Sequence, residues 1–173
     1  MLTVNNYNYI CRMMLDKNSP LFEYMPLGRT VTKVTKKYFG ALSKKLEHLG
    51  IDRHFSPLVV IDKTKEKCTQ QYLSDLLNID KVAMVRILDY LVKRGMIIRA
   101  VNPSDRREHI LQLTPKAKKI MPQIHSGIAE MNQTAFKGLT KNEQELFHTL
   151  LETILKNLGS LPANKVDIKI KKK

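Results

Sequence analysis

The stretch GMIIRAVNPSDRREHILQLTPKAKKI, which runs from Gly95 to Ile120, decides how this chain folds. Its two runs MIIRAV and HILQLT are rich in Ile, Val and Leu, and each is long enough for one β-strand. The polar link NPSDRRE lies between them and carries Asp105 followed at once by two arginines. The pattern predicts a two-stranded hairpin that holds these charged residues at its tip.

The residues before this hairpin predict two short helices joined by a tight turn. Thr69 is a good N-cap for an amphipathic helix that stops near Asn78, where NID makes the turn. Asp80 then caps a second helix, which Gly95 ends. The side chains expected to face inward from this second helix are Met84, Val85, Leu88, Leu91 and Val92. Two short helices joined in this way form a helix-turn-helix, and the following hairpin makes it a winged helix.

The second helix is expected to read DNA through its open face. Small and basic residues in its first turns suit the major groove, because bulky side chains would hold the backbone away from base edges. The candidate contacts are Lys81, Val82, Ala83, Arg86 and Tyr90 on this recognition helix, and Thr69, Gln70 and Gln71 on the preceding one. Two alternatives stay open. Arg86 can pair with Asp89 or Glu108 on the surface, and Tyr90 can pack its ring on the domain.

The tip of the hairpin is a second candidate DNA contact, through Ser104, Asp105, Arg106 and Arg107. An arginine there can enter the narrow minor groove, where the negative potential is focused. A nearby carboxylate can hold the guanidinium in one direction. The alternative is an ordinary solvated turn with a local ion pair.

The charge of the chain points to a polyanionic partner. The 173 residues include 30 Lys and Arg against 16 Asp and Glu, which gives a formal net charge of +14. The field of such a molecule attracts nucleic acid first and anionic membranes second. A non-specific architectural or RNA-associated basic protein would use the same charge, so it remains the alternative function.

Other classes of function lack the residues they need. Catalysis is not expected, because the chain has seven glycines, no GxGxxG motif and no compelling acid pair. The five histidines show no zinc-ligand spacing, so neither a metal nor a cofactor is expected. No apolar run approaches the roughly 20 residues that span a bilayer, and no secretory signal is recognised. We therefore expect a cytoplasmic, nucleoid-associated protein.

A family resemblance covers about forty contiguous residues, NIDKVAMVRILDYLVKRGMIIRAVNPSDRREHILQLTPKAK. This stretch resembles the MarR/SlyA family of bacterial regulators, in which a recognition helix is followed by a DxR wing and an LTxxG/A helix start. Asp105 and Arg107 match the DxR motif, Arg106 is its basic middle residue, and Arg86 matches the recognition-helix arginine. The resemblance implies a homodimer that binds a pseudo-palindromic operator, usually as a repressor relieved by a small molecule or by oxidation.

Two features depart from the family pattern. Pro57 lies inside the short helix of that pattern, which leaves its start at either Asp52 or Ser56. The link KTKEK is brief, so the little strand that often precedes Thr69 is expected to be absent.

Long helices flank the winged helix on both sides. An apolar stripe from Leu27 to Leu49 predicts one helix that ends at Gly50. A second helix begins after Thr114, and Pro122 should kink or interrupt it. A third begins with the capping box TKNE, and its apolar stripe is wider than a lone surface helix needs. Part of that stripe should be buried against another subunit.

The expected fold is therefore mainly α (α+β), a winged helix-turn-helix with long N- and C-terminal dimerisation helices. The expected organisation is an N-terminal arm (1–20), a helical dimerisation region (21–50 and 114–160), a winged helix-turn-helix DNA-binding domain (51–113) and a basic tail (161–173). The lysines of the tail are available for non-specific phosphate contacts.

Regulation leaves fewer signals. Cys11 lies near Tyr7 and Tyr9 and is a candidate redox sensor, with an inert thiol as the alternative, whereas Cys68 is expected to be structural. By resemblance, an effector pocket would draw on residues such as Tyr38, His48, His54 and Phe55, each of which also fits a core position. No ligand is assigned.

Overall fold

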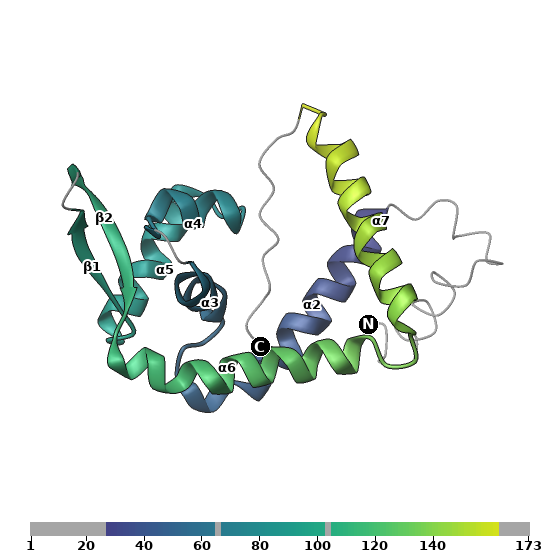
Figure 1. Ribbon diagram of the computed structural model, residues 1–173, viewed down its shortest axis with the longest axis horizontal. Helices are drawn as coiled ribbons and strands as arrows, with labels where there is room; N and C mark the ends of the chain where they lie inside the picture. Colours follow the sequence, from purple (N-terminus) through teal and green to yellow (C-terminus); the bar gives the residue numbers. More distant parts are fainter. Residues whose placement is uncertain (1–26, 65–66, 103–104, 163–173) are drawn as a thin grey trace, which may run out of the picture. The chain divides into compact units, whose positions relative to one another are not determined.

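The computed structural model describes residues 27–64, 67–102 and 105–162, and the described side chains of the last range begin at Glu108. The chain divides into two compact units, residues 1–38 with 162–173 and residues 39–161. Of the first unit, the structure describes the N-terminal part of α2 and Pro162. The second unit holds the rest of α2 and every later element (Figure 1).

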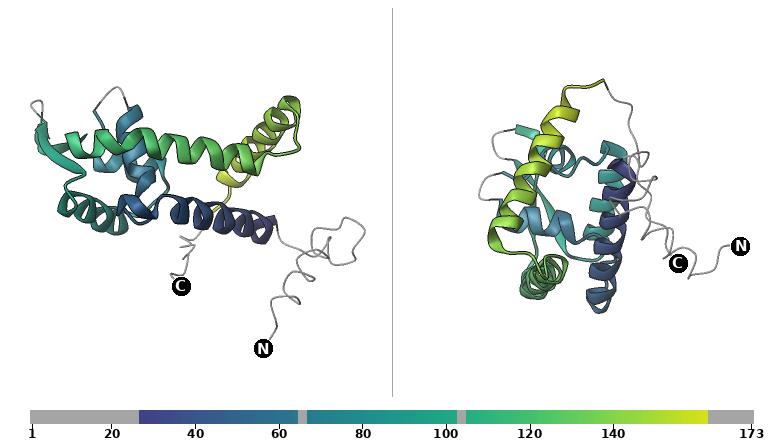
Figure 2. Two further views of the ribbon diagram at one scale, coloured as in Figure 1. Left: turned by 90° about the horizontal axis from the view of Figure 1, so that it is seen from below. Right: turned by 90° about the vertical axis from the view of Figure 1, so that its right-hand side faces the viewer.

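The chain is mainly helical with one small sheet, as expected. The elements are α2 (Leu27–Lys45), the 3-10 turn η1 (Glu47–Leu49), α3 (Phe55–Lys63), α4 (Gln70–Leu76), α5 (Lys81–Lys93), β1 (Ile97–Asn102), β2 (Asp105–Leu113), α6 (Pro115–Ala135) and α7 (Lys141–Gly159). Within the second unit, the β1–β2 hairpin lies at one end of α6 and α7 follows its other end (Figure 2). Among the helices of the described ranges, none is long and apolar enough to cross a membrane.

The local signals that delimit the helix-turn-helix are confirmed. The Thr69 hydroxyl accepts a hydrogen bond from the Tyr72 amide at 3.2 Å, and the Asp80 carboxylate accepts one from the Ala83 amide at 2.9 Å. Gly95 has a φ of +66°, which favours glycine, and it ends α5. The capping box of α7 is also present, with both Thr140–Glu143 bonds formed.

Two helix boundaries and one helix interior differ from the expectation. The helix expected to end at Gly50 ends at Lys45, and η1 completes the path to Gly50. Helix α3 begins at Phe55 with His54 as N-cap, so neither Asp52 nor Ser56 caps it. Helix α6 continues through Pro122 without a break, so of the kink or interruption expected there, the interruption is wrong.

The hairpin is longer than predicted. Strand β2 begins at Asp105, so the predicted link NPSDRRE shrinks to two residues. Pairing is regular from Ile97 with Leu113 to Val101 with His109, and then shifts so that Asn102 pairs with Asp105. The strand before Thr69 is reduced to one bridge between Thr69 and Ile110.

The core of the second unit fastens the recognition helix to its neighbours. Helix α5 packs against α4 and β1, and α3 packs against α6 and β2. Met84, Leu88 and Leu91 are fully buried, as expected, but Val85 and Val92 are 38% and 39% exposed. The expectation that these two valines face inward is therefore wrong, because they lie at the edge of the buried face.

A glycine brings α6 close to α2. A Cβ built on Gly127 would lie 2.9 Å from Cδ2 of Leu46 and 3.7 Å from Cδ1 of Leu42. Both leucines are buried, so neither can swing away into solvent. Glycine thus permits a close contact with these leucines that any side chain at this position would prevent.

We predict opposite effects for two Gly→Ala substitutions. Gly40→Ala should stabilise the protein by about 0.5–1 kcal/mol, because Gly40 lies in α2 with nothing within 4 Å of an added Cβ. Gly127→Ala should destabilise it by about 1 kcal/mol, because overpacking exceeds the same helix gain. Urea unfolding at one protein concentration measures both, and equal stabilisation would contradict the close approach.

Candidate nucleic-acid interface

The outward face of α5 lies opposite its buried face. Val82 and Arg86 are one turn apart on this face and both are exposed, and Lys81 and Lys93 are exposed on the same helix. Ala83 is half-buried beside the Asp80 cap. The face therefore combines positive charge with Val82, which at 63% exposed is the most exposed apolar side chain of α5.

The two carboxylates that could pair with Arg86, those of Asp89 and Glu108, both contact other residues. Asp89 binds Arg99 of β1, with 2.7 Å between Oδ1 and Nη2. Glu108 accepts a hydrogen bond from the Asn102 amide at 2.7 Å. Within the part of the chain that the structure describes, no ion pair involves Arg86. Its guanidinium is available to an incoming ligand.

Tyr90 follows the packing alternative in this structure. Its hydroxyl donates a hydrogen bond to the Gly50 carbonyl at 3.2 Å, and its ring centre lies 4.9 Å from that of His54. The Arg94 guanidinium lies 5.3 Å from the centre of the Tyr90 ring. Contact of Tyr90 with DNA stays a prediction, and these bonds restrict how far the side chain can reach.

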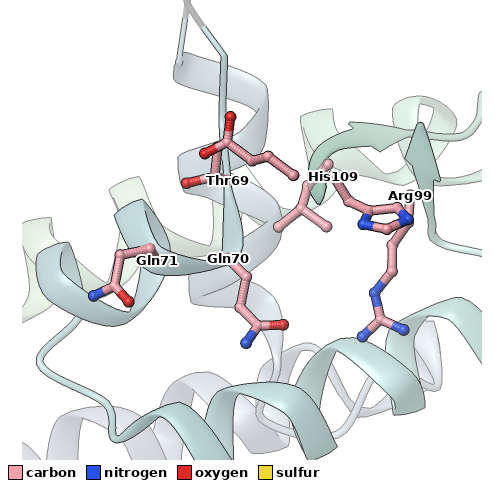
Figure 3. A pocket seen from close by; sticks show the side chains of 7 residues that line it. Thr69, Gln70, Gln71, Arg99 and His109 are labelled. Carbon is pink, nitrogen blue, oxygen red and sulfur yellow. The ribbon is translucent and has the colours of Figure 1, made fainter. Parts of the chain in front are cut away.

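The three candidate residues before α5 border a cleft of about 290 Å³ between α4 and the hairpin (Figure 3). Its lining comprises Thr69, Gln70, Gln71, Arg99, Glu108, His109 and Leu111. In Figure 3 the Gln70 and Arg99 side chains point the same way, whereas Gln71 points away from them. Gln71 donates to Asp75 at 2.7 Å, and Thr69 is occupied as N-cap. Gln70 is therefore the most available of the three.

A buried amide holds the tip end of the hairpin in place, and the sequence analysis did not predict it. Asn102 is 3% exposed, its Oδ1 accepts from Lys67 Nζ at 3.2 Å, and its amide nitrogen donates to Glu108. Further along the hairpin, the Leu111 amide donates to the Cys68 carbonyl at 2.8 Å. An Asn before a Pro at the end of an apolar strand was the available signal.

The predicted wing contacts are described in part. The backbone of Asp105, Arg106 and Arg107 belongs to β2, where Asp105 pairs with Asn102. Their side chains, and the whole of Ser104, lie outside the described residues. Their contact with DNA stays a prediction.

The sensing candidates have different settings. Cys68 is buried, and this burial raises the pKa of its thiol, while a hydrogen bond with Thr64 offsets part of the rise. A protonated buried thiol reacts slowly, which agrees with a structural role. Cys11 lies outside the described residues. Within the described ranges, no group of His, Cys, Asp and Glu is arranged to hold a metal ion.

The suggested effector residues of the second unit differ in how deeply they are buried and in what they contact. Phe55 is buried, with its ring centre 6.0 Å from that of Phe39. His48 is exposed and binds Gln123 of α6 at 3.0 Å, and His54 packs on Tyr90. These contacts support structural roles and assign no ligand.

The sequence of this chain matches known regulators over most of its length. The sequence pattern of the MarR family matches residues 51–108. The multiple antibiotic resistance protein MarR of Salmonella typhimurium is 32% identical over 143 residues, which cover 82% of this chain and 99% of that protein. The Escherichia coli K12 protein of the same name is 30% identical over the same coverage.

Solved structures agree with this match. A cysteine-to-serine mutant of E. coli MarR, complexed with operator DNA, is 32% identical with a TM-score of 0.69 and covers 77% of this chain and 96% of that one. A MarR transcriptional regulator from Methanosarcina mazei is 26% identical with a TM-score of 0.69, covering 78% and 98%. The chain therefore belongs to the MarR family, and it is a DNA-binding transcriptional regulator rather than an enzyme.

Proposed function

We propose that this protein is a repressor that binds a pseudo-palindromic operator as a homodimer and is released by a small-molecule effector. The outward face of α5 is the observation that carries the proposal, because it presents Arg86, which has no ion-pair partner among the described residues, in a chain of net charge +14. Two such helices, about 34 Å apart, would enter successive major grooves, with the wings on the flanking minor grooves.

The comparisons support operator DNA as the partner. The E. coli relative that is 32% identical was solved with operator DNA, and the match to it covers 77% of this chain. We extend that property to this chain, with its site of action on the nucleoid in the cytoplasm. Sequence-specific sites should bind roughly 10³ to 10⁷ times more tightly than random duplex at the same salt concentration.

The exposed apolar stripe of α7 supports the homodimer. No residue of α7 is buried in the single chain, and its exposed apolar residues are Leu146, Phe147, Leu150, Leu155 and Leu158. Helix α2 also exposes Leu27, Val31 and Val34. Exposed apolar area costs about 25 cal/mol per Å², so covering these residues with a second copy would stabilise the assembly.

An effector would act by preferring one conformation of the dimer over another. Its test is the operator titration repeated with candidate small molecules or with peroxide. A ligand that shifts the operator affinity supports release, and an affinity that no candidate changes removes this part of the proposal.

We predict that Arg86→Ala relaxes sequence preference. The loss of a bidentate contact to a base edge should cost roughly 1–3 kcal/mol on the operator and much less on random duplex. The matched control is Lys93→Ala on the same helix, which should weaken both duplexes alike, since phosphate contacts carry no sequence information. Equal weakening by Arg86→Ala would reduce Arg86 to a phosphate contact. If the unmodified protein itself shows no preference, the non-specific architectural or RNA-associated alternative is favoured.

Arg107→Ala is expected to lower operator affinity strongly without unfolding the domain, because the wing would lose its minor-groove arginine. Lys141→Ala is the control, because it removes the same charge from the exposed start of α7. Fluorescence anisotropy titration and a thermal melt would be recorded for both. An unchanged titration for Arg107→Ala removes the wing from the mechanism.

A charge placed on the α7 stripe should dissociate the dimer. Leu150 is 52% exposed in the single chain, so Leu150→Glu should cost the monomer little, but it would bury a carboxylate in the dimer. Thr149→Glu places the same charge beside the stripe and should leave the dimer intact. Sedimentation equilibrium measures the mass of each. A dimer that tolerates Leu150→Glu contradicts this interface.

A further inference from the structure

Val82 is an apolar side chain that the fold of the described chain does not use. It is 63% exposed at the second position of α5, whereas the buried side of this helix consists of Met84, Leu88 and Leu91. A β-branched residue is a slightly poorer helix former than alanine, and here no burial offsets that cost. Stability of the chain therefore gives no reason for a valine at this position.

The surroundings of Val82 identify the kind of surface that would cover it. Lys81 precedes it, and Arg86 lies one turn later on the same face. Both cations are exposed, so an apolar protein partner would have to bury them, whereas duplex DNA offers them phosphates and base edges. The first residues of a recognition helix are those that reach base edges in the major groove. The one apolar group on those edges is the 5-methyl group of thymine.

We propose that Val82 packs against the 5-methyl group of a thymine in each half of the operator and so determines specificity at that base pair. This inference rests on the proposed function and adds the base that one side chain recognises. Val82 and Arg86 are separated by about 6 Å along the helix axis. Base pairs rise by about 3.4 Å, so the thymine should lie within about two base pairs of the base that Arg86 contacts.

The same helix supplies a matched control. Val92 is 39% exposed and lies ten residues later, about 15 Å further along the helix axis. Val92→Ala is chemically identical to Val82→Ala but removes methyl groups far from the first turn of the helix. Both substitutions are on an exposed surface, and circular dichroism would verify that both variants fold.

The experiment first selects preferred duplexes from a random pool with the full-length protein. Each thymine of the selected duplex is then replaced singly by deoxyuridine, which lacks only the 5-methyl group, and affinities are measured by fluorescence anisotropy. At one thymine per half-site, the replacement should weaken binding about four-fold for the unmodified protein and for Val92→Ala, as expected for the loss of one buried methyl group. The same replacement should change nothing with Val82→Ala.

The outcomes separate this inference from the function on which it rests. Two results would overturn the role of Val82 but not operator binding. In one, deoxyuridine at every thymine of the consensus sequence leaves the affinity unchanged; in the other, it lowers the affinity of Val82→Ala as much as that of the unmodified protein. A selection that yields no consensus overturns operator binding itself. A change in sedimentation mass with Val82→Ala would show that a second copy of the chain covers the residue, and it would also overturn the inference.

Discussion

The burial of one face of α5 is the constraint on which the candidate interface depends. Met84, Leu88 and Leu91 are completely buried, and the burial of each such side chain contributes about 1.5–3 kcal/mol. The helix cannot rotate about its axis without exposing them. Because side chains hold fixed angular positions around a helix, Val82 and Arg86 must then point outward. The same packing that stabilises the domain thus decides which side chains of α5 face outward.

Polar contacts of unequal strength hold the wing to α5 and to the segment before α4. The Asp89–Arg99 pair joins α5 to β1, but both side chains are partly solvated, so the pair contributes little by itself. The Asn102 amide is buried, and leaving either end without a partner would cost about 1–3 kcal/mol. Lys67 and Glu108 satisfy both ends at the register shift. Asn102 therefore contributes more than the ion pair to holding the tip end of the hairpin in place.

The two proposed interaction surfaces have opposite physical properties. The recognition face is charged and needs a polyanion, whereas α7 carries an apolar stripe that no residue of the described chain buries. A dimer that covers the apolar stripe would carry twice the net charge of +14. Repulsion between two such chains opposes association, and a large apolar interface would be needed to exceed it.

Local signals explain what could be predicted. The side chains of Thr69 and Asp80 accept hydrogen bonds from amides three residues later, and Gly95 ends α5 locally. The caps and the helix-turn-helix could therefore be predicted from the order of the residues. The two strands of the hairpin could be predicted too. The link between them was predicted too long, because Asp105 pairs across the hairpin with Asn102 and so belongs to β2. The start of α3 was missed because His54 provides no side-chain cap to recognise.

The sequence by itself determined the net charge, the order of helices and strands, and the outward position of Arg86. Tertiary structure alone decided that Val85 and Val92 stay exposed, that Tyr90 bonds to a carbonyl 40 residues away, and that Asn102 is buried. Helical periodicity gives the direction of a side chain, but its burial depends on which segment, distant in the sequence, packs over it. That packing depends on the assembled core and cannot be inferred from any short stretch of residues.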